Sequence, residues 1–117
     1  MLSKGGENVI EMVLRVGTPA QARDLLGWVH ADELLPCRVS CEVAIRPMPV
    51  PAIPGAVGSS RIDTRGGGTA PPFDRYLVDF TIGRRLVLVE RAGGPGVPTA
   101  REALTAATAA YRRILAD

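Results

Sequence analysis

The sequence is poor in the residues that usually identify an enzyme or a metalloprotein. It has one histidine, two cysteines and one lysine, and its aromatic residues amount to 4%. So few aromatic rings disfavour binding of single-stranded nucleic acid by base stacking. No segment approaches the roughly 20 consecutive apolar residues of a membrane span, and residues 1–8 lack the apolar core of a signal peptide. We therefore expect a cytoplasmic protein without a membrane anchor.

Familiar ligand-binding motifs are also missing. Cys37 and Cys41 fall on one predicted strand, about 13 Å apart along the chain, which is too far for a disulfide. With His30 alone they cannot complete a zinc site. The glycines at 66–68 follow Arg65 and do not join a strand to a helix, as a phosphate-binding loop would. We expect no cofactor, no metal and no catalytic residue.

Length and composition are those of an ordinary globular domain. The 117 residues are 46% hydrophobic and 22% charged, enough for one core without disulfides. The net charge of +2 is too small to indicate a nucleic-acid partner by itself.

The first half of the chain predicts a strand, a helix and a second strand. Residues 9–16 alternate in polarity, which is typical of a half-buried strand. Thr18, Pro19 and Gln21 then form a capping box with proline in the first turn, so a helix begins there. The apolar stripe of this helix comprises Ala22, Leu25, Leu26 and Val29. Residues 37–46 alternate again and predict the second strand.

Residues 47–72 interrupt the alternating pattern. Prolines alternate with apolar residues as far as Pro54, which favours extended polyproline-like chain, and several glycines follow. Loops of this length are uncommon in compact domains, so we expect this one to be flexible or functional. Residues 57–63 could hold a short strand within it.

The last third predicts a hairpin and a helix. Residues 75–91 read as two strands with a turn near Gly83, where glycine can supply a positive φ. A second capping box, Thr99 with Glu102, begins a C-terminal helix. The order β-α-β-(long loop)-β-β-α predicts a single α+β domain over residues 1–117. We expect a four-stranded, mostly antiparallel sheet with both helices on one face, a ferredoxin-like variant in which the first two strands run parallel.

Few polar or aromatic residues stand out. His30 lies near the end of the first helix and is interpreted as a surface histidine. The aspartates Asp63, Asp74 and Asp79 have no spacing that defines an acid/base pair. Trp28 lies beside the apolar stripe; packing at the edge of the core is the favoured interpretation, and an exposed interface anchor is the alternative.

Arginines gather around the predicted hairpin turn. The set consists of Arg84 and Arg85 together with Arg61, Arg65, Arg75 and Arg91. Because aromatic residues are not interleaved with them, a solvated cationic rim is favoured over an anion site, and a nucleic-acid partner is not expected.

Three segments resemble the effector-associated constant component proteins of bacteria. They are Ala22-Arg23-Asp24-Leu25-Leu26-Gly27-Trp28-Val29, Asp32-Glu33-Leu34 and Pro51-Ala52-Ile53-Pro54-Gly55-Ala56-Val57-Gly58. The resemblance covers residues 9–58, and it ends where the family continues into a long apolar helical segment that this chain lacks. It implies a small adaptor without catalytic residues that pairs with variable effectors such as peptidases.

The favoured hypothesis is a non-enzymatic interaction or adaptor module that binds a protein partner, an effector or a peptidase among them. The predicted contact residues are Trp28, Pro51, Pro54, Arg65, Arg84 and Arg85. A homo-oligomer is also expected, because sheet edges need to be covered and two-fold dimers are the commonest solution.

Two alternatives remain open. One is a small cofactor-free, dimeric ferredoxin-like enzyme with a pocket between sheet and helices, for which Tyr76, His30 and Asp79 are the candidate residues. The other is anion or nucleic-acid binding through the arginine rim.

Overall fold

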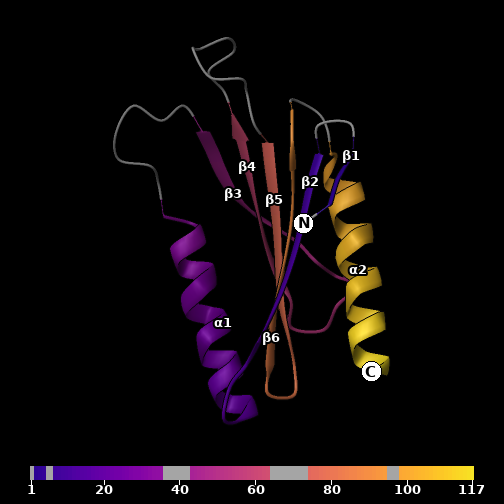
Figure 1. Ribbon diagram of the computed structural model, residues 1–117. Helices are drawn as coiled ribbons and strands as arrows, with labels where there is room; N and C mark the ends of the chain where they lie inside the picture. Colours follow the sequence, from indigo (N-terminus) through magenta and orange to yellow (C-terminus); the bar gives the residue numbers. More distant parts are fainter. Residues whose placement is uncertain (1, 5–6, 36–42, 64–73, 95–97) are drawn as a thin grey trace.

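Within the part of the chain that the structure describes, eight helices and strands follow one another (Figure 1). The computed structural model describes residues 2–4, 7–35, 43–63, 74–94 and 98–117. The elements are β1 (Leu2–Lys4), β2 (Glu7–Arg15), α1 (Pro19–Glu33), β3 (Val43–Met48), β4 (Val57–Asp63), β5 (Asp74–Ile82), β6 (Arg85–Gly93) and α2 (Ala100–Ala116). Together they form a single α+β domain.

The strands form one sheet of six in the order β1-β2-β6-β5-β4-β3, and every neighbouring pair is antiparallel. The expectation of four strands is therefore wrong. β4 occupies Val57–Asp63, the place where a short strand was predicted, and β1 adds a short edge. β2 and β3 run in the same direction, as predicted, but three strands lie between them. Of the predicted strand 37–46, residues 37–42 lie outside the described residues.

The two helices lie on opposite faces of the sheet, and not on one face as predicted (Figure 1). The cause is β5, which is apolar or buried on both sides. Val78 and Phe80 join the core on the α2 side, whereas Asp79 faces α1 and meets its residues His30 and Glu33. Because successive side chains of a strand alternate, each face of β5 needs its own cover. The ferredoxin-like arrangement is not confirmed.

Both predicted capping boxes are confirmed. At the start of α1, the Gln21 main-chain NH donates to Thr18 Oγ1 at 3.1 Å, and the Thr18 NH donates to Gln21 Oε1 at 3.1 Å. At the start of α2, the Glu102 NH donates to Thr99 Oγ1 at 3.2 Å, and the Thr99 NH donates to Glu102 Oε1 at 3.0 Å. These side chains satisfy main-chain NH groups that have no partner within a helix.

The main core lies between the sheet and α2. The buried residues that form it are Met48, Val50, Ile53, Val78, Phe80, Val87, Val89, Ala107, Ala110 and Ile114. Phe80 meets Tyr111 edge to face, with ring centroids 5.5 Å apart, a geometry that aromatic pairs prefer.

The first part of the predicted flexible loop belongs to this core. Val50 and Ile53 are buried, and a turn closes behind them, in which the Ala56 NH donates to the Ile53 carbonyl at 3.2 Å and Gly55 has a φ of 70°. Apolar side chains between the prolines thus anchor the segment. Residues 64–72 of that loop lie outside the described residues.

The predicted hairpin is confirmed. Ile82 pairs with Arg85, so the turn consists of Gly83 and Arg84, and Gly83 has a φ of 57°. The Val16 NH donates to the Arg84 carbonyl at 2.8 Å, which ties the end of β2 to the same turn.

Gly58 provides a test of how β3 and β4 pack. A Cβ atom at Gly58 would lie 2.8 Å from the Met48 carbonyl oxygen and 2.8 Å from Val50 Cγ2. We expect Gly58→Ala to lower the free energy of unfolding by about 1–3 kcal/mol, measured by urea denaturation. Gly27→Ala is the matched control, because nothing lies within 4 Å of that Cβ and alanine favours a helix by about 1 kcal/mol. Equal stability of Gly58→Ala and wild type would contradict the close approach.

Candidate functional site

The contact residues predicted from the sequence fall on several segments of the chain. Trp28 on α1 is 70% exposed, so the favoured interpretation of core-edge packing is wrong. Pro51 and Pro54 are exposed in the turn before β4. Arg84 and Arg85 lie at the hairpin turn, while Arg65 lies outside the described residues. Their role as contact residues stays a prediction.

Part of the arginine rim surrounds a hollow at the hairpin end. Arg15, Arg84 and Arg85 line a space of about 390 Å³ together with Asp117. The Arg85 guanidinium donates to the Ile114 carbonyl at 3.5 Å. The Asp117 carboxylate offsets part of the positive charge, so the hollow is a weaker anion site than the count of arginines indicates.

Two other arginines of the predicted rim lie elsewhere and have partners. Arg61 donates to the Glu33 carbonyl at 3.2 Å. Arg75 donates from Nε to Glu90 Oε1 at 3.0 Å and forms an ion pair with the same carboxylate. The predicted rim is therefore not one continuous surface.

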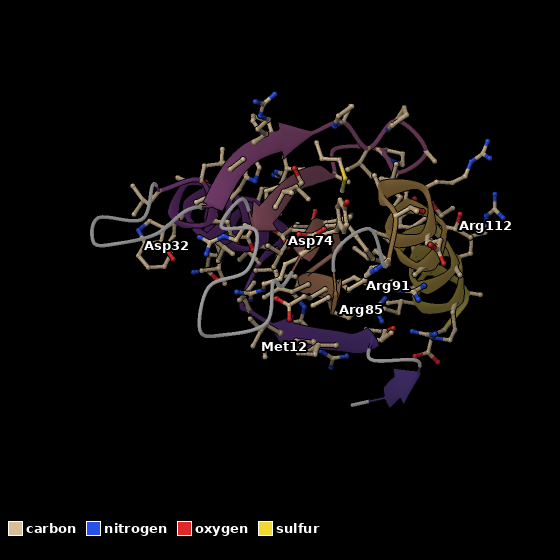
Figure 2. All side chains as sticks on the ribbon, turned by 90° about the horizontal axis from the view of Figure 1, so that it is seen from above. Met12, Asp32, Asp74, Arg85, Arg91 and Arg112 are labelled. Atoms are coloured by element: carbon tan, nitrogen blue, oxygen red, sulfur yellow. The ribbon has the colours of Figure 1, made fainter. Side chains whose placement is uncertain are left out.

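The sheet face beside α1 is only partly covered. α1 packs on β4, β5 and β6. On β2, the side chains of Ile10, Met12 and Leu14 remain exposed. Register places them on this face, because Met12 pairs with Leu88, which in turn pairs with Asp79. Figure 2 shows Met12 projecting from β2 on the side of the sheet where α1 lies.

The uncovered region forms a shallow apolar groove of about 280 Å³. Its lining consists of Ile10, Met12, Leu77 and Leu88 together with Arg75 and Glu90, and the sheet register places Glu90 between Ile10 and Leu77. Because Arg75 and Glu90 form an ion pair, the two charges in the groove balance each other. We call this region, together with Leu14, the open face.

α1 carries a second exposed apolar surface on its outer side. Trp28, Ala31 and Leu35 line a hollow of about 310 Å³ with Asp32. Ala22 and Leu26 are the buried residues of the helix, and at about 100° per residue Trp28 and Ala31 point away from them. We call Trp28, Ala31 and Leu35 the outer stripe.

A group of polar side chains lies between α1 and β5. The ligand-type atoms of His30, Glu33 and Asp79 all lie within 4.8 Å of one another, and we call these three residues the polar cluster. His30 Nδ1 and Glu33 Oε1 are 3.9 Å apart. Asp79 is 0% exposed, and neither of its carboxyl oxygens has a hydrogen-bond partner among the described residues.

Local structure explains how the polar cluster assembles. His30 and Glu33 are three residues apart on α1, so they share one helix face. That face turns toward the sheet because Ala22 and Leu26 are buried against it. Arg61 on β4 donates to the Glu33 carbonyl and holds the end of α1 over the sheet. His30 is therefore half-buried, and the interpretation as a surface histidine is wrong.

The surroundings of Asp79 shift its acidity. Burial raises the pKa of Asp79 from 3.8 to about 9, and the adjacent Glu33 carboxyl group contributes to the same rise. Asp79 therefore keeps its proton at neutral pH. An uncharged acid is the form that a buried site without hydrogen-bond donors favours.

Tyr76 does not join the other two candidates of the enzyme hypothesis. It packs against the core on the α2 side, whereas His30 and Asp79 meet on the α1 side. Burial, and then the charge of Asp74, raise the pKa of Tyr76. The predicted trio is thus only partly brought together.

Sequence reasoning missed the role of Glu33. The spacing of His30 and Glu33 on a helix was a usable signal, but nothing in the sequence connected that pair to a residue on a distant strand. Asp79 was placed opposite the apolar face of its strand, the usual position of a solvated side chain. Because α1 covers this face of the sheet, Asp79 is shielded from solvent.

Comparison with known proteins adds no assignment: no family model, no curated protein and no solved structure matches this chain. Among the helices in the described ranges, none is both long and apolar enough to cross a membrane. The resemblance to effector-associated components stays a prediction.

Asp79→Asn tests the state of the polar cluster. Asn has nearly the shape of a protonated Asp but cannot ionise. Folded wild type holds the Asp79 proton up to about pH 9, whereas the unfolded chain loses it near pH 4. Between these values the folded state binds the extra proton, so its stability falls as pH rises, by at most about 1.4 kcal/mol per pH unit.

We expect urea denaturation of metal-free protein to give similar stabilities for Asp79→Asn and wild type near pH 4, and a more stable variant at about pH 8. Asp32→Asn, an exposed change on α1, is the control and should follow wild type. If the stability of Asp79→Asn runs parallel to wild type across this range, Asp79 is not a buried neutral acid.

Proposed function

We propose that this chain is a protein-interaction module whose docking surface is the open face. The observation behind the proposal is the row Ile10, Met12 and Leu14, which is exposed on a sheet face that α1 covers only in part. Apolar side chains that alternate on one face of a strand normally point into a core. Here they point to a surface that lacks a covering layer.

The size and lining of the open face favour a protein ligand. Four of the six residues that line the groove of about 280 Å³ are apolar, and the other two, Arg75 and Glu90, form an ion pair. Contiguous exposed apolar regions are uncommon on monomeric proteins and mark sites of association. Sheet faces are most often covered by a packed helix or a second sheet.

The occupant that we propose is a second copy of this chain. Each copy carries a sheet face that lacks a helix and a helix that presents an apolar outer stripe. A two-fold pair in which each outer stripe packs on the partner's open face would cover both surfaces in both copies. Self-complementary contacts of this kind are the usual basis of dimers.

A stable dimer sets a requirement on the size of the contact. Such an interface buries about 800 Å² per partner, roughly a ninth of the 7147 Å² that one copy exposes, and the open face and the outer stripe together would supply it. Trp28 is suited to the centre of the contact, because exposed tryptophans are prominent among residues that dominate binding energy.

Met12→Asp tests this proposal. Sedimentation velocity at concentrations up to about 0.1 mM, well above a Kd of ~1 μM, should show wild-type dimers. A carboxylate at position 12 would be buried without a partner in the interface, so we expect the variant to be monomeric. At concentrations well below Kd it should be as stable as wild type.

Val13→Asp is the matched control. Val13 is 46% exposed and Met12 is 48% exposed, and the two are neighbours on β2 that point to opposite faces. Val13→Asp should leave the dimer intact. The proposal that a second copy occupies the open face would be overturned if wild type were monomeric. It would also be overturned if Met12→Asp and Val13→Asp changed dimerisation equally.

Trp28→Ala tests the outer stripe. Loss of a central tryptophan should weaken dimerisation by about 2 kcal/mol or more, a rise in Kd of about thirtyfold. At protein concentrations well below Kd, where both proteins are monomeric, the replacement should not lower the melting temperature, because the Trp28 side chain lies outside the core. If Trp28→Ala leaves the Kd of the dimer unchanged, the outer stripe is not part of the interface. If Met12→Asp also leaves it unchanged, the interface lies outside both proposed surfaces.

A further inference from the structure

We propose that the polar cluster, His30, Glu33 and Asp79, binds a divalent transition-metal ion of the zinc class. The proposal stands on the geometry beneath α1 and is independent of the proposed docking function. It would explain why three polar side chains are gathered in a buried position without hydrogen-bond partners among the described residues.

The first argument is the position of Asp79. Its side chain is 0% exposed, and no hydrogen-bond donor among the described residues reaches either oxygen. His30 Nδ1 and Glu33 Oε1 are also buried atoms without such a partner. Polar atoms buried in this way are rare in folded proteins and call for a specific reason. A shared cation would satisfy all three side chains together.

Charge supports the same conclusion. Arg61, on the strand next to β5, donates to the Glu33 main-chain carbonyl. Two carboxylate ligands bring two negative charges to a metal site, which a divalent cation neutralises.

The distances are close to those of a metal site. Zinc ligands lie about 2.0–2.2 Å from the ion, which puts tetrahedral ligand atoms about 3.4 Å apart. His30 Nδ1 and Glu33 Oε1 are 3.9 Å apart, and all three groups fall within 4.8 Å. Coordination of one ion by all three groups therefore needs shifts of the ligand atoms of about 1 Å.

The donor atoms select the class of ion. One imidazole nitrogen with two carboxylate oxygens suits zinc and related transition metals, whereas calcium and magnesium prefer oxygen ligands alone. The side chains of His30 and Glu33 are 20% and 14% exposed, so solvent reaches one side of the cluster. A water molecule can complete the coordination from that side.

Ser59 gives the cluster a further polar neighbour. It is fully buried, and its hydroxyl has no hydrogen-bond partner among the described residues. It lies on β4 on the same face as Asp79, because Ser59 pairs with Leu77 and Val57 pairs with Asp79. A hydroxyl in this position could hydrogen-bond a ligating carboxylate, as partners of metal ligands commonly do.

The test is calorimetric titration of the metal-free full-length protein with zinc chloride. Because free thiols bind zinc non-specifically, the titration uses the Cys37→Ser/Cys41→Ser background. We expect one ion per chain and a rise in melting temperature of several degrees. Magnesium chloride, tested in parallel, should bind far more weakly.

Asp79→Asn and Glu33→Gln should each weaken zinc binding by at least about 100-fold, and His30→Ala should do the same. Asp79→Asn is the decisive variant, because the neutral amide should fold at least as well as wild type. Asp32→Asn on the outer side of α1 should bind zinc like wild type. Absence of zinc binding, or binding that Asp79→Asn leaves unchanged, would overturn the proposal and leave the polar cluster as a proton-sharing pair of carboxyl groups.

Discussion

The arrangement of this protein depends on β5, a central strand that must be covered on both faces. Its alternate side chains divide between two environments: Val78 and Phe80 join the apolar core under α2, while Asp79 turns under α1. A strand inside an antiparallel sheet often leaves one face to solvent. At Val78, Asp79 and Phe80 both faces of β5 are buried, so the helices lie on opposite sides of the sheet and enclose a carboxyl group.

The two sides of the sheet are consequently unlike. The α2 side is closed by a continuous core to which the turn before β4 contributes Val50 and Ile53. The α1 side is incomplete, because the helix covers β4, β5 and β6 and leaves the apolar row of β2 exposed. Both proposals concern this side. A metal ion held by the polar cluster would fix α1 to β5, and the same helix carries the outer stripe that we propose as the dimer contact.

Local signals in the sequence were sufficient for most of the secondary structure. Thr18 and Thr99 marked both helix starts, Gly83 marked the hairpin turn, and alternation marked β2 and the hairpin strands. What could not be predicted was how these elements face one another. Alternation gives two sides to a strand, but it does not say which side a distant helix will cover, so the helices were placed on one face.

The candidate site was harder to predict for the same reason. His30 and Glu33 are close in sequence, but Asp79 reaches them only through the sheet order, which no local pattern encodes. Its neighbours on β5 made it look like a solvated residue. Trp28 was wrongly predicted to pack at the edge of the core. The apolar stripe of α1 does not reveal that only a narrow part of the helix, at Ala22 and Leu26, is buried.

The most direct test of this account is the ionisation of Asp79 itself. In metal-free protein, the side-chain carboxyl carbon of Asp79 can be followed by NMR between about pH 3 and about pH 10, the range that spans free and buried carboxyl groups. The account predicts a titration midpoint of about 9, with the signal unchanged near pH 4. A midpoint near 4 would contradict it, because the carboxyl group would then lie in water and α1 would not enclose the polar cluster.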